Sequence, residues 1–224
     1  KKLGLPEKML YRHPFPGPGL GVRLLCSNGD IPNSDFNNIQ PLVSDVAKQF
    51  GVTGLALPIR SVGVKADLRA YEYPVLISGN VPWNDLIKVV SSLTSEVDDI
   101  NRCIWNLGPE IPKAARSLAT SATRERLDIL READFIVMDT LKSNNLYHEI
   151  WQCPTVLLPI ELDGLEGEMV IVRPIMSERG MTAAPVALPP SVLKELTKRI
   201  LQLEGVSSLA LDITSKPPGT IEWE

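Results

Sequence analysis

Amphipathic stripes and short apolar runs alternate along this chain of 224 residues. Apolar side chains at helical spacing predict four helices, each with one buried face, at residues 39–50, 85–93, 127–141 and 191–203. Apolar runs too short for helices predict buried strands at residues 55–59, 73–78, 99–105, 156–160 and 206–213. This mixture of strands and helices indicates an α+β fold.

The order of these elements repeats along the chain. The proline-containing run at 55–59 is echoed at 156–160, and the run at 73–78 is echoed at 173–177. Each half reads helix, strand, strand, helix, strand, which predicts two tandem, similar α-β-β-α-β units, each a small sheet covered by helices. Prolines and small residues at 106–121 indicate the linker. The alternative is two unrelated α+β segments with ordinary strand composition.

Composition places the chain among soluble globular proteins, with 44% hydrophobic and 22% charged residues. A net charge of -4 gives no general attraction to nucleic acid or to an anionic membrane, so any anion site must be local. No apolar run reaches the length of a membrane span. The first residue is Lys rather than Met, from which we expect a piece of a longer protein.

The three cysteines, Cys26, Cys103 and Cys153, lie far apart and lack metal-ligand spacing. Such thiols are typical of reduced, structural cysteines, so we expect a cytoplasmic protein without a metal site in this chain.

The last ten residues, 215–224, follow the apolar run that ends at residue 213. Two prolines stiffen this segment, and Gly219 allows another backbone to approach closely. Lys216 supplies a compact, mobile positive charge beside short hydroxyl donors, which suits a phosphate group. Spacing by itself favours the alternative, a turn that ends the sheet with a solvated lysine. The segment is therefore a candidate phosphate site.

Residues 12–23 form a second unusual stretch, in which prolines and glycines lie between two arginines. This composition argues against a helix or a central strand. The glycine spacing superficially matches a dinucleotide-binding loop, but no strand precedes it and the prolines remove the donors that such a loop needs. We predict a rigid loop that presents Arg12, His13 and Arg23 to a neighbouring domain. The alternative is a proline-rich linker.

Three long motifs together resemble one family. They are Arg-His-Pro-Phe-Pro-Gly-Pro-Gly-Leu at 12–20, Leu-Pro-Ile-Arg-Ser-Val-Gly-Val at 57–64 and Lys-Pro-Pro-Gly-Thr-Ile-Glu-Trp-Glu at 216–224. In this order they resemble the C-terminal part of GMP synthetase, the glutamine-dependent ligase that aminates XMP. The resemblance spans nearly the whole chain. It matches the dimerisation domain and not the amidotransferase or the ATP pyrophosphatase domain.

The resemblance implies a division of labour. Mg and ATP belong to the absent pyrophosphatase, so this chain alone should hold no catalytic residue and should be inactive. Its partners would be XMP and its own two catalytic domains. It also implies domain bounds: a junction loop at 1–30, a first dimerisation-type subdomain at 31–110, and a linker with a second subdomain and an XMP-binding tail at 111–224.

Several site residues follow from the resemblance alone. Lys216 should meet the XMP phosphate, and Glu222 should accept hydrogen bonds from the nucleotide. Gln152 matches a nucleotide-contacting glutamine of the family. Asp67 stands in a Gly-Asp signature in which Ala66 replaces the usual glycine.

Only the first half keeps Asp67 and Arg69, and only the second keeps the lysine-containing tail. We therefore predict an intramolecular pseudo-dimer with one composite XMP site, in which Asp67 and Arg69 reach toward Lys216 and Glu222. Such an arrangement lowers the need for a homodimer, although a homodimer is the form that one-unit relatives take. The alternative function is a non-catalytic dimerisation or interaction module that has lost the nucleotide.

Overall fold

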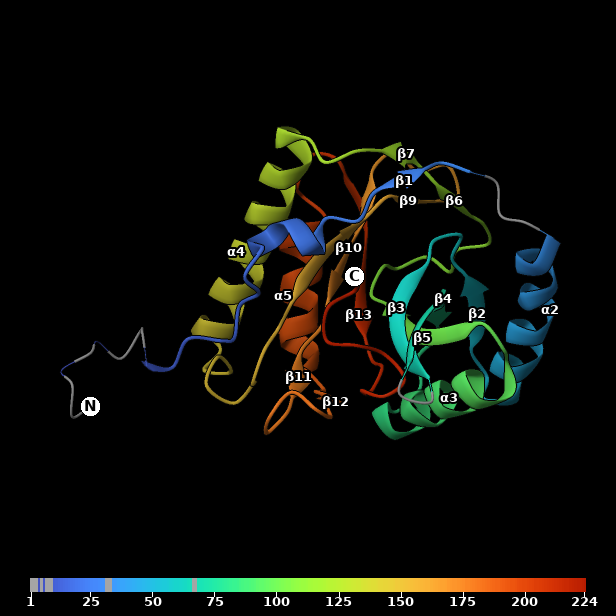
Figure 1. Cartoon of the computed structure of the whole chain (residues 1–224), viewed down its shortest axis with the longest axis horizontal. Coiled ribbons are helices and arrows are strands. Elements are labelled where there is room, and N and C mark those ends of the chain that lie inside the picture. The colour runs from blue at the N-terminus through green and yellow to red at the C-terminus, as the bar shows by residue number, and fades with distance from the viewer. Residues whose placement is uncertain (1–3, 5, 7–9, 31–33, 66–67) are drawn as a thin grey trace.

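A computed structural model describes residues 4, 6, 10–30, 34–65 and 68–224. Within these residues, four α-helices accompany a mixed main sheet and three two-stranded sheets (Figure 1). The helices are α2 (Ser34–Gln49), α3 (Trp83–Glu96), α4 (Arg124–Ser143) and α5 (Pro190–Ile200), and a 3₁₀-helix, η1, spans Gly19–Arg23. The α+β class is therefore confirmed.

The main sheet has seven strands in the order β2-β4-β5-β13-β10-β8, with β3 paired to β4. Its strands are β2 (Thr53–Ala56), β3 (Ser61–Lys65), β4 (Leu68–Ser78), β5 (Ile100–Asn106), β8 (Thr155–Leu158), β10 (Glu168–Val172) and β13 (Val206–Asp212). The pairs β4–β5 and β10–β13 are parallel, whereas the other pairs are antiparallel. A single helix, α3 or α5, makes the crossover that each parallel pair requires.

The three small sheets surround the main one and connect distant segments. They pair β1 (Ser27–Asn28) with β7 (Ala119–Thr120), β6 (Ala115–Ser117) with β9 (Ile160–Leu162), and β11 (Ile175–Met176) with β12 (Ala184–Pro185). The predicted linker at 106–121 therefore contains two short strands. One of them is paired to the N-terminal segment and the other to the second half.

The two faces of the main sheet carry separate apolar clusters, because successive strand residues point to opposite sides. On β4, Val75 and Ile77 belong to the cluster that includes all four α-helices, whereas Leu76 belongs to the other cluster. Figure 1 shows α2 and α3 beside β2, β4 and β5, and α4 and α5 beside β10 and β13. All four α-helices therefore cover one face.

The other face is covered by loops and by the C-terminal segment. Leu25, Leu57 and Trp223 pack there against the strands, and Trp223 is 0% exposed. The end of the chain is thus part of the core. Among the described residues, the helices are all too short or too polar to cross a bilayer.

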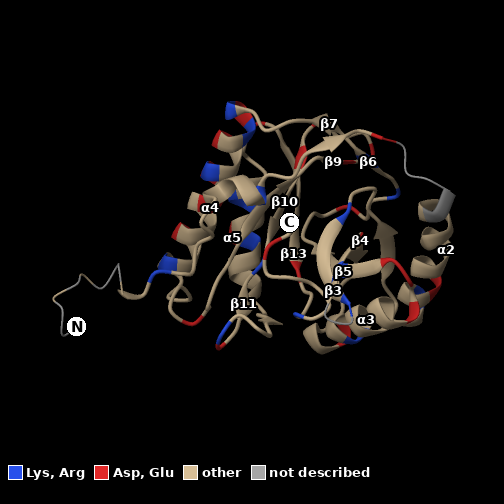
Figure 2. Ribbon diagram, in the orientation of Figure 1, with Lys and Arg blue, Asp and Glu red and all other residues tan. Residues whose placement is uncertain are grey.

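The predicted helices are confirmed in place, but two of their apolar residues face solvent. Leu42 on α2 is 51% exposed and Phe135 on α4 is 65% exposed. Phe135 lies about 140° around the helix from the buried Leu130, because each residue turns the helix by about 100°. Figure 2 shows acidic and basic residues interspersed along α4, as expected for a helix with a wide polar face.

Two details of the predicted repeat are corrected. Residues 173–177 do not echo the buried part of β4, because β10 ends at Val172, before Arg173 and Pro174. Ile175 and Met176 instead form β11. Moreover, β5 and β13 pair directly, with Trp105 opposite Leu211, so that one continuous sheet replaces the two small sheets that we expected.

Candidate functional site

The C-terminal tail, residues 213–224, returns across the loop-covered face and joins the first half of the chain. The backbone N–H of Val64 donates to the carbonyl oxygen of Pro218 at 2.7 Å, and that of Val62 donates to Trp223 at 2.9 Å. A Cβ at Gly63 would lie 2.7 Å from the Pro218 oxygen, so this close approach requires glycine. The tail therefore runs beside β3.

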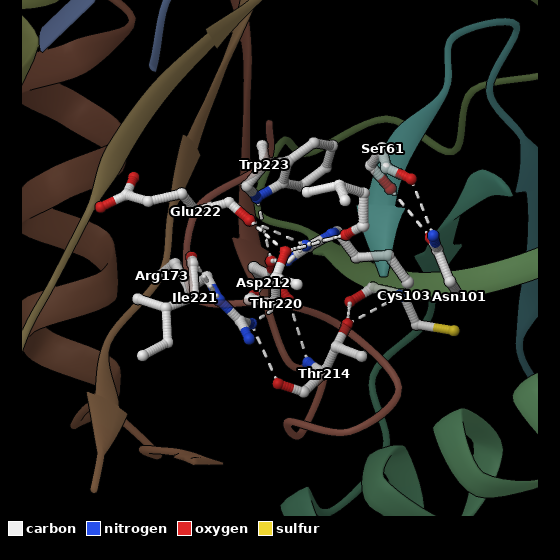
Figure 3. A network of polar contacts seen from close by, with 12 residues as sticks. Ser61, Asn101, Cys103, Arg173, Asp212, Thr214, Thr220, Ile221, Glu222 and Trp223 are labelled. Atoms are coloured by element: carbon white, nitrogen blue, oxygen red, sulfur yellow. Dashed lines mark hydrogen bonds and ion pairs between the residues drawn. The ribbon is translucent and has the colours of Figure 1, made fainter. Parts of the chain in front are cut away.

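A buried ionic cluster lies beneath this tail (Figure 3). Asp212, at the end of β13, pairs with Arg102 of β5 at 2.7 Å and with Arg173 at 2.6 Å, and all three side chains are 0% exposed. The indole N–H of Trp223 donates to Asp212 at 3.1 Å, and Arg102 lies 4.6 Å from the centroid of the Trp223 ring. Two cations and one anion are thus enclosed by the fold.

Charge and burial act against each other in this cluster. Burial raises the pKa of Asp212, but Arg173, Arg102 and the Thr214 N–H outweigh it, so the net pKa lies below the usual value. Burial lowers the pKa of Arg173 to about 10, partly offset by Asp212, which leaves the guanidinium protonated at neutral pH. The cluster is therefore ionic under physiological conditions.

Carbonyl oxygens of the tail accept hydrogen bonds from both guanidinium groups. Arg173 donates to the carbonyl oxygens of Thr214 at 2.9 Å and Ile221 at 3.2 Å. Arg102 donates to those of Thr220 and Glu222, each at 3.2 Å, and to Val62 of β3 at 3.0 Å. Hydrogen bonds from charged donors are the stronger kind, so the backbone of the tail is fixed at both ends.

Glu222 leaves this network and points away from Asp212 (Figure 3). Both of its carboxylate oxygens accept hydrogen bonds from Arg23 of η1, each at 2.9 Å. The amide nitrogen of Gln152 lies 3.5 Å from Oε1 of Glu222 and donates to the carbonyl oxygen of Pro14 at 2.9 Å. Two predicted site residues, Gln152 and Glu222, are thus brought together.

Arg23 differs from expectation in both structure and orientation. The prediction that residues 12–23 exclude a helix is wrong for Gly19–Arg23, which form the 3₁₀ turn η1. Arg23 is also only 2% exposed, so it faces Glu222 rather than a neighbouring domain. Its guanidinium lies 5.2 Å from the centroid of the Phe15 ring. Arg23 points inward because it binds the Glu222 carboxylate of the tail. This partner could not be predicted locally, because it lies 199 positions away in the sequence.

Lys216 lies half-buried in the same tail. Its ammonium nitrogen donates to the carbonyl oxygen of Gly180 at 2.6 Å. A Cβ at Gly180 would be 3.7 Å from the Trp151 ring and 3.8 Å from Cδ1 of Ile221. Lys216 therefore contacts a loop that also touches the neighbours of Gln152 and Glu222 in the sequence.

Of the predicted residues of the first half, Arg69 lies on β4, which pairs with β3. Arg69 is exposed and stands opposite Val64, whose N–H binds the tail. Asp67 lies outside the described residues. The strand that pairs with Arg69 therefore contacts the tail that carries Lys216.

The N-terminal loop closes a small cavity of about 180 Å³ beside Gln152. His13, Arg23 and Asp134 of α4 line it, together with the exposed Arg12. Burial raises the pKa of the Asp134 carboxyl, although Arg23 and His13 oppose this. Cys153 also lines the cavity, and burial raises the pKa of its thiol. Such a thiol is not a reactive nucleophile.

The surroundings of His13 disfavour a charged ring. Its Nε2 lies 2.8 Å from the carbonyl oxygen of Tyr147, and the two rings stack at 4.2 Å. Its Nδ1 is buried without a hydrogen-bond partner among the described residues. A proton at Nδ1 would therefore be an unsatisfied buried donor, and burial lowers the pKa of His13 below 6.5.

We expect this histidine to make the fold sensitive to mild acid. Because the folded pKa lies below the unfolded value, the stabilisation is complete above pH 6.5 and is lost as pH falls through the folded pKa. Urea denaturation of the wild type at pH 7.5 and 5.5 should show this loss, and His13→Gln should lack it. His148→Gln, which changes the other of the two histidines, should retain it. An equal pH dependence in His13→Gln and the wild type would contradict the expectation.

Sequence reasoning missed Arg102, Arg173 and Asp212. Their signal is a charged residue inside an apolar run or at its end, which indicates a buried partner but not its identity. Arg102 interrupts the run at 99–105, and Asp212 interrupts the run at 206–213.

Comparison with known proteins gives this arrangement a family. Residues 139–223 match the family described as GMP synthase C terminal domain. This chain carries a GMP synthase C-terminal domain. The matched part of that domain begins within α4 and ends at Trp223, so it includes Gln152, Lys216 and Glu222. It excludes the first half of the chain, with Arg23 and Arg102.

Named relatives extend the likeness to the GMP synthase C-terminal domain across the first half. A probable glutamine-hydrolyzing GMP synthase of Leptospira interrogans is 37% identical over 99% of the chain, and one of Caenorhabditis elegans is 30% identical over all of it. A GMP synthase of Synechocystis is 41% identical over 65% of the chain. The chain spans 37%, 40% and 30%, respectively, of these relatives.

Proposed function

We propose that this chain is the XMP-binding and assembly part of a glutamine-hydrolysing GMP synthase. The observation that carries the proposal is that Gln152 lies beside Glu222. Lys216 of the same tail binds the nearby loop at Gly180. These three residues come from two segments of the matched family domain. Together they offer a cation, a carboxylate and an amide, which are the groups that recognise a nucleotide monophosphate.

Each side chain has donors or acceptors suited to its role. The Lys216 ammonium has three donors, and the Gly180 carbonyl uses one, which leaves two for a phosphate. Arg23 holds the Glu222 carboxylate in one orientation, so that it can accept from hydroxyl or N–H groups of the nucleotide. Gln152 has an amide oxygen besides the nitrogen that binds Pro14, and so it can accept from a base edge.

We further propose that the two halves are tandem units that form one composite site. The sheet order supports this, because the sequence β5-β4-β2 on one side of the β5–β13 pair matches β13-β10-β8 on the other. Each half also places one helix in its parallel crossover. The contact between Val64 and Pro218 joins the tail to the strand that pairs with Arg69 of the first half.

The remaining steps are assigned to other parts of the polypeptide. Mg and ATP would activate XMP in a pyrophosphatase domain, and an amidotransferase domain would release ammonia from glutamine. Among the described residues, no three His, Cys, Asp or Glu side chains form a metal-binding group. Because these steps belong to the other two domains, we assign this chain no catalytic residue and expect it to be inactive alone, in a cytoplasmic enzyme. An intramolecular pseudo-dimer and a homodimer both accommodate the composite site.

Equilibrium titration of XMP tests the proposal. Gln152→Leu in the full-length polypeptide should weaken XMP binding about five- to tenfold, because one or two hydrogen bonds are lost. Gln202→Leu is the same substitution at an exposed residue that follows α5, and this variant should bind XMP like the wild type. Equal affinity in both variants would instead favour the alternative function, an interaction module without the nucleotide.

A further inference from the structure

Arg173 holds both ends of the tail segment that carries Lys216. Its Nη1 donates to the Thr214 carbonyl oxygen at 2.9 Å, two residues before Lys216. Its Nε donates to the Ile221 carbonyl oxygen at 3.2 Å, one residue before Glu222. One planar group therefore sets the separation of the two peptides that flank the proposed phosphate and nucleotide contacts.

The position of this guanidinium is fixed from below. Asp212 binds the same Nη1 at 2.6 Å, and its other oxygen binds Arg102 at 2.7 Å. Arg102 in turn donates to the Glu222 carbonyl oxygen at 3.2 Å and to Val62 of β3 at 3.0 Å. The cluster thus connects the tail to the hairpin that carries Arg69.

Stability alone is a weak reason for such a cluster. Buried ion pairs cost so much desolvation that apolar residues of similar volume often stabilise a protein equally well. An apolar side chain, however, cannot donate to two carbonyl oxygens in fixed directions. Arginine is therefore needed here because its planar group fixes the positions of two carbonyl oxygens in the tail backbone.

We infer that Arg173 is a positioning residue for XMP binding: its guanidinium spaces Lys216 and Glu222 for one nucleotide. The inference rests on the proposed function, since it assigns a role within the same site. Arg173 itself has no exposed surface, so it acts through the tail and not on XMP. A variant that weakens the contact between Arg173 and the tail should bind XMP less tightly, while turnover at saturating XMP stays largely intact.

Arg173→Lys in the full-length polypeptide is the first test. Lysine keeps a charge for Asp212 but cannot reach both the Thr214 and the Ile221 carbonyl. Arg126→Lys is the matched control, because Arg126 is also buried, pairs with both oxygens of Glu168 and donates to two carbonyls, of Leu25 and Ser121, outside the tail. Both variants should lose similar thermal stability.

The KM for XMP should separate the two variants. We expect Arg173→Lys to raise it about five- to tenfold relative to Arg126→Lys, with kcat at saturating XMP within about twofold. If Arg173→Lys does not fold, Thr214→Val is the second test of the inference. It removes the hydroxyl that accepts from the Cys103 N–H at 2.8 Å and so loosens the residue whose carbonyl binds Arg173. A raised KM for XMP in that variant supports the inference.

Two results would overturn it in different ways. In the first, Lys216→Ala raises the KM for XMP, but Arg173→Lys and Thr214→Val have the same KM for XMP as Arg126→Lys. The inference then fails and the proposed function stands. If Lys216→Ala leaves the KM for XMP unchanged, the proposed function fails, and the inference fails with it.

Discussion

Lys216→Ala in the full-length polypeptide should raise the apparent KM for XMP about ten- to a hundredfold, because one charge-assisted phosphate contact contributes about 1.5–3 kcal/mol. The ammonium is half-buried and already oriented by the Gly180 carbonyl at 2.6 Å. Little further ordering is therefore needed when the phosphate binds. Steady-state rates of GMP formation at varied XMP would measure the effect.

Two comparisons make this result specific. Hydrolysis of glutamine by the amidotransferase should be largely unchanged, since Lys216 belongs to a different part of the enzyme. Lys194→Ala removes an exposed lysine of α5 and should leave the KM for XMP at its wild-type value. An equal KM in Lys216→Ala and the wild type would remove Lys216 from the site, and the proposed function would fail.

Asp212→Asn should destabilise the protein by about 3–5 kcal/mol, because it leaves two buried arginines without their shared counterion. Asp128→Asn is the matched control, since Asp128 also pairs with two arginines, Arg124 and Arg131, but its side chain is 55% exposed. Ion pairs in water are weak, so this variant should lose less than about 1 kcal/mol. Urea denaturation followed by circular dichroism would give both free energies of unfolding.

The same pair of variants predicts a dependence on pH. Because the folded pKa of Asp212 lies below its unfolded value, its stabilisation is complete above the unfolded pKa of about 3.9 and is lost as pH falls through the folded pKa. The difference in unfolding free energy between the wild type and Asp212→Asn should therefore be constant from pH 7 to 5 and shrink below pH 4. If Asp212→Asn and Asp128→Asn lost the same free energy of unfolding, burial would not strengthen the ion pairs of Asp212.

Local patterns predicted elements where one physical constraint dominates. The stripe at 85–93 corresponds to α3, and the run at 206–213 corresponds to β13, because burial of one face imposes its own period on the chain. The echo at 173–177 was wrong because composition alone cannot distinguish a strand from a strand end. The strand β10 ends at Val172, and Ile175 and Met176 pair with β12 instead.

The candidate site was predictable only residue by residue. The motifs indicated Gln152, Lys216 and Glu222, and the structure places Gln152 and Glu222 within 3.5 Å of each other. Arg23 was assigned to a neighbouring domain because its partner lies 199 positions away in the sequence. No local pattern identifies a partner across that distance.

Local sequence patterns were enough to predict the α+β class, the four α-helices, several strands of the main sheet and the tail motif that carries Lys216. These depend on side-chain periodicity and on backbone limits of proline and glycine, which act over a few residues. Long-range packing was needed to pair β5 with β13, Arg23 with Glu222, and Asp212 with both Arg102 and Arg173. A buried charge requires a counterion, but packing of the whole chain selects which one.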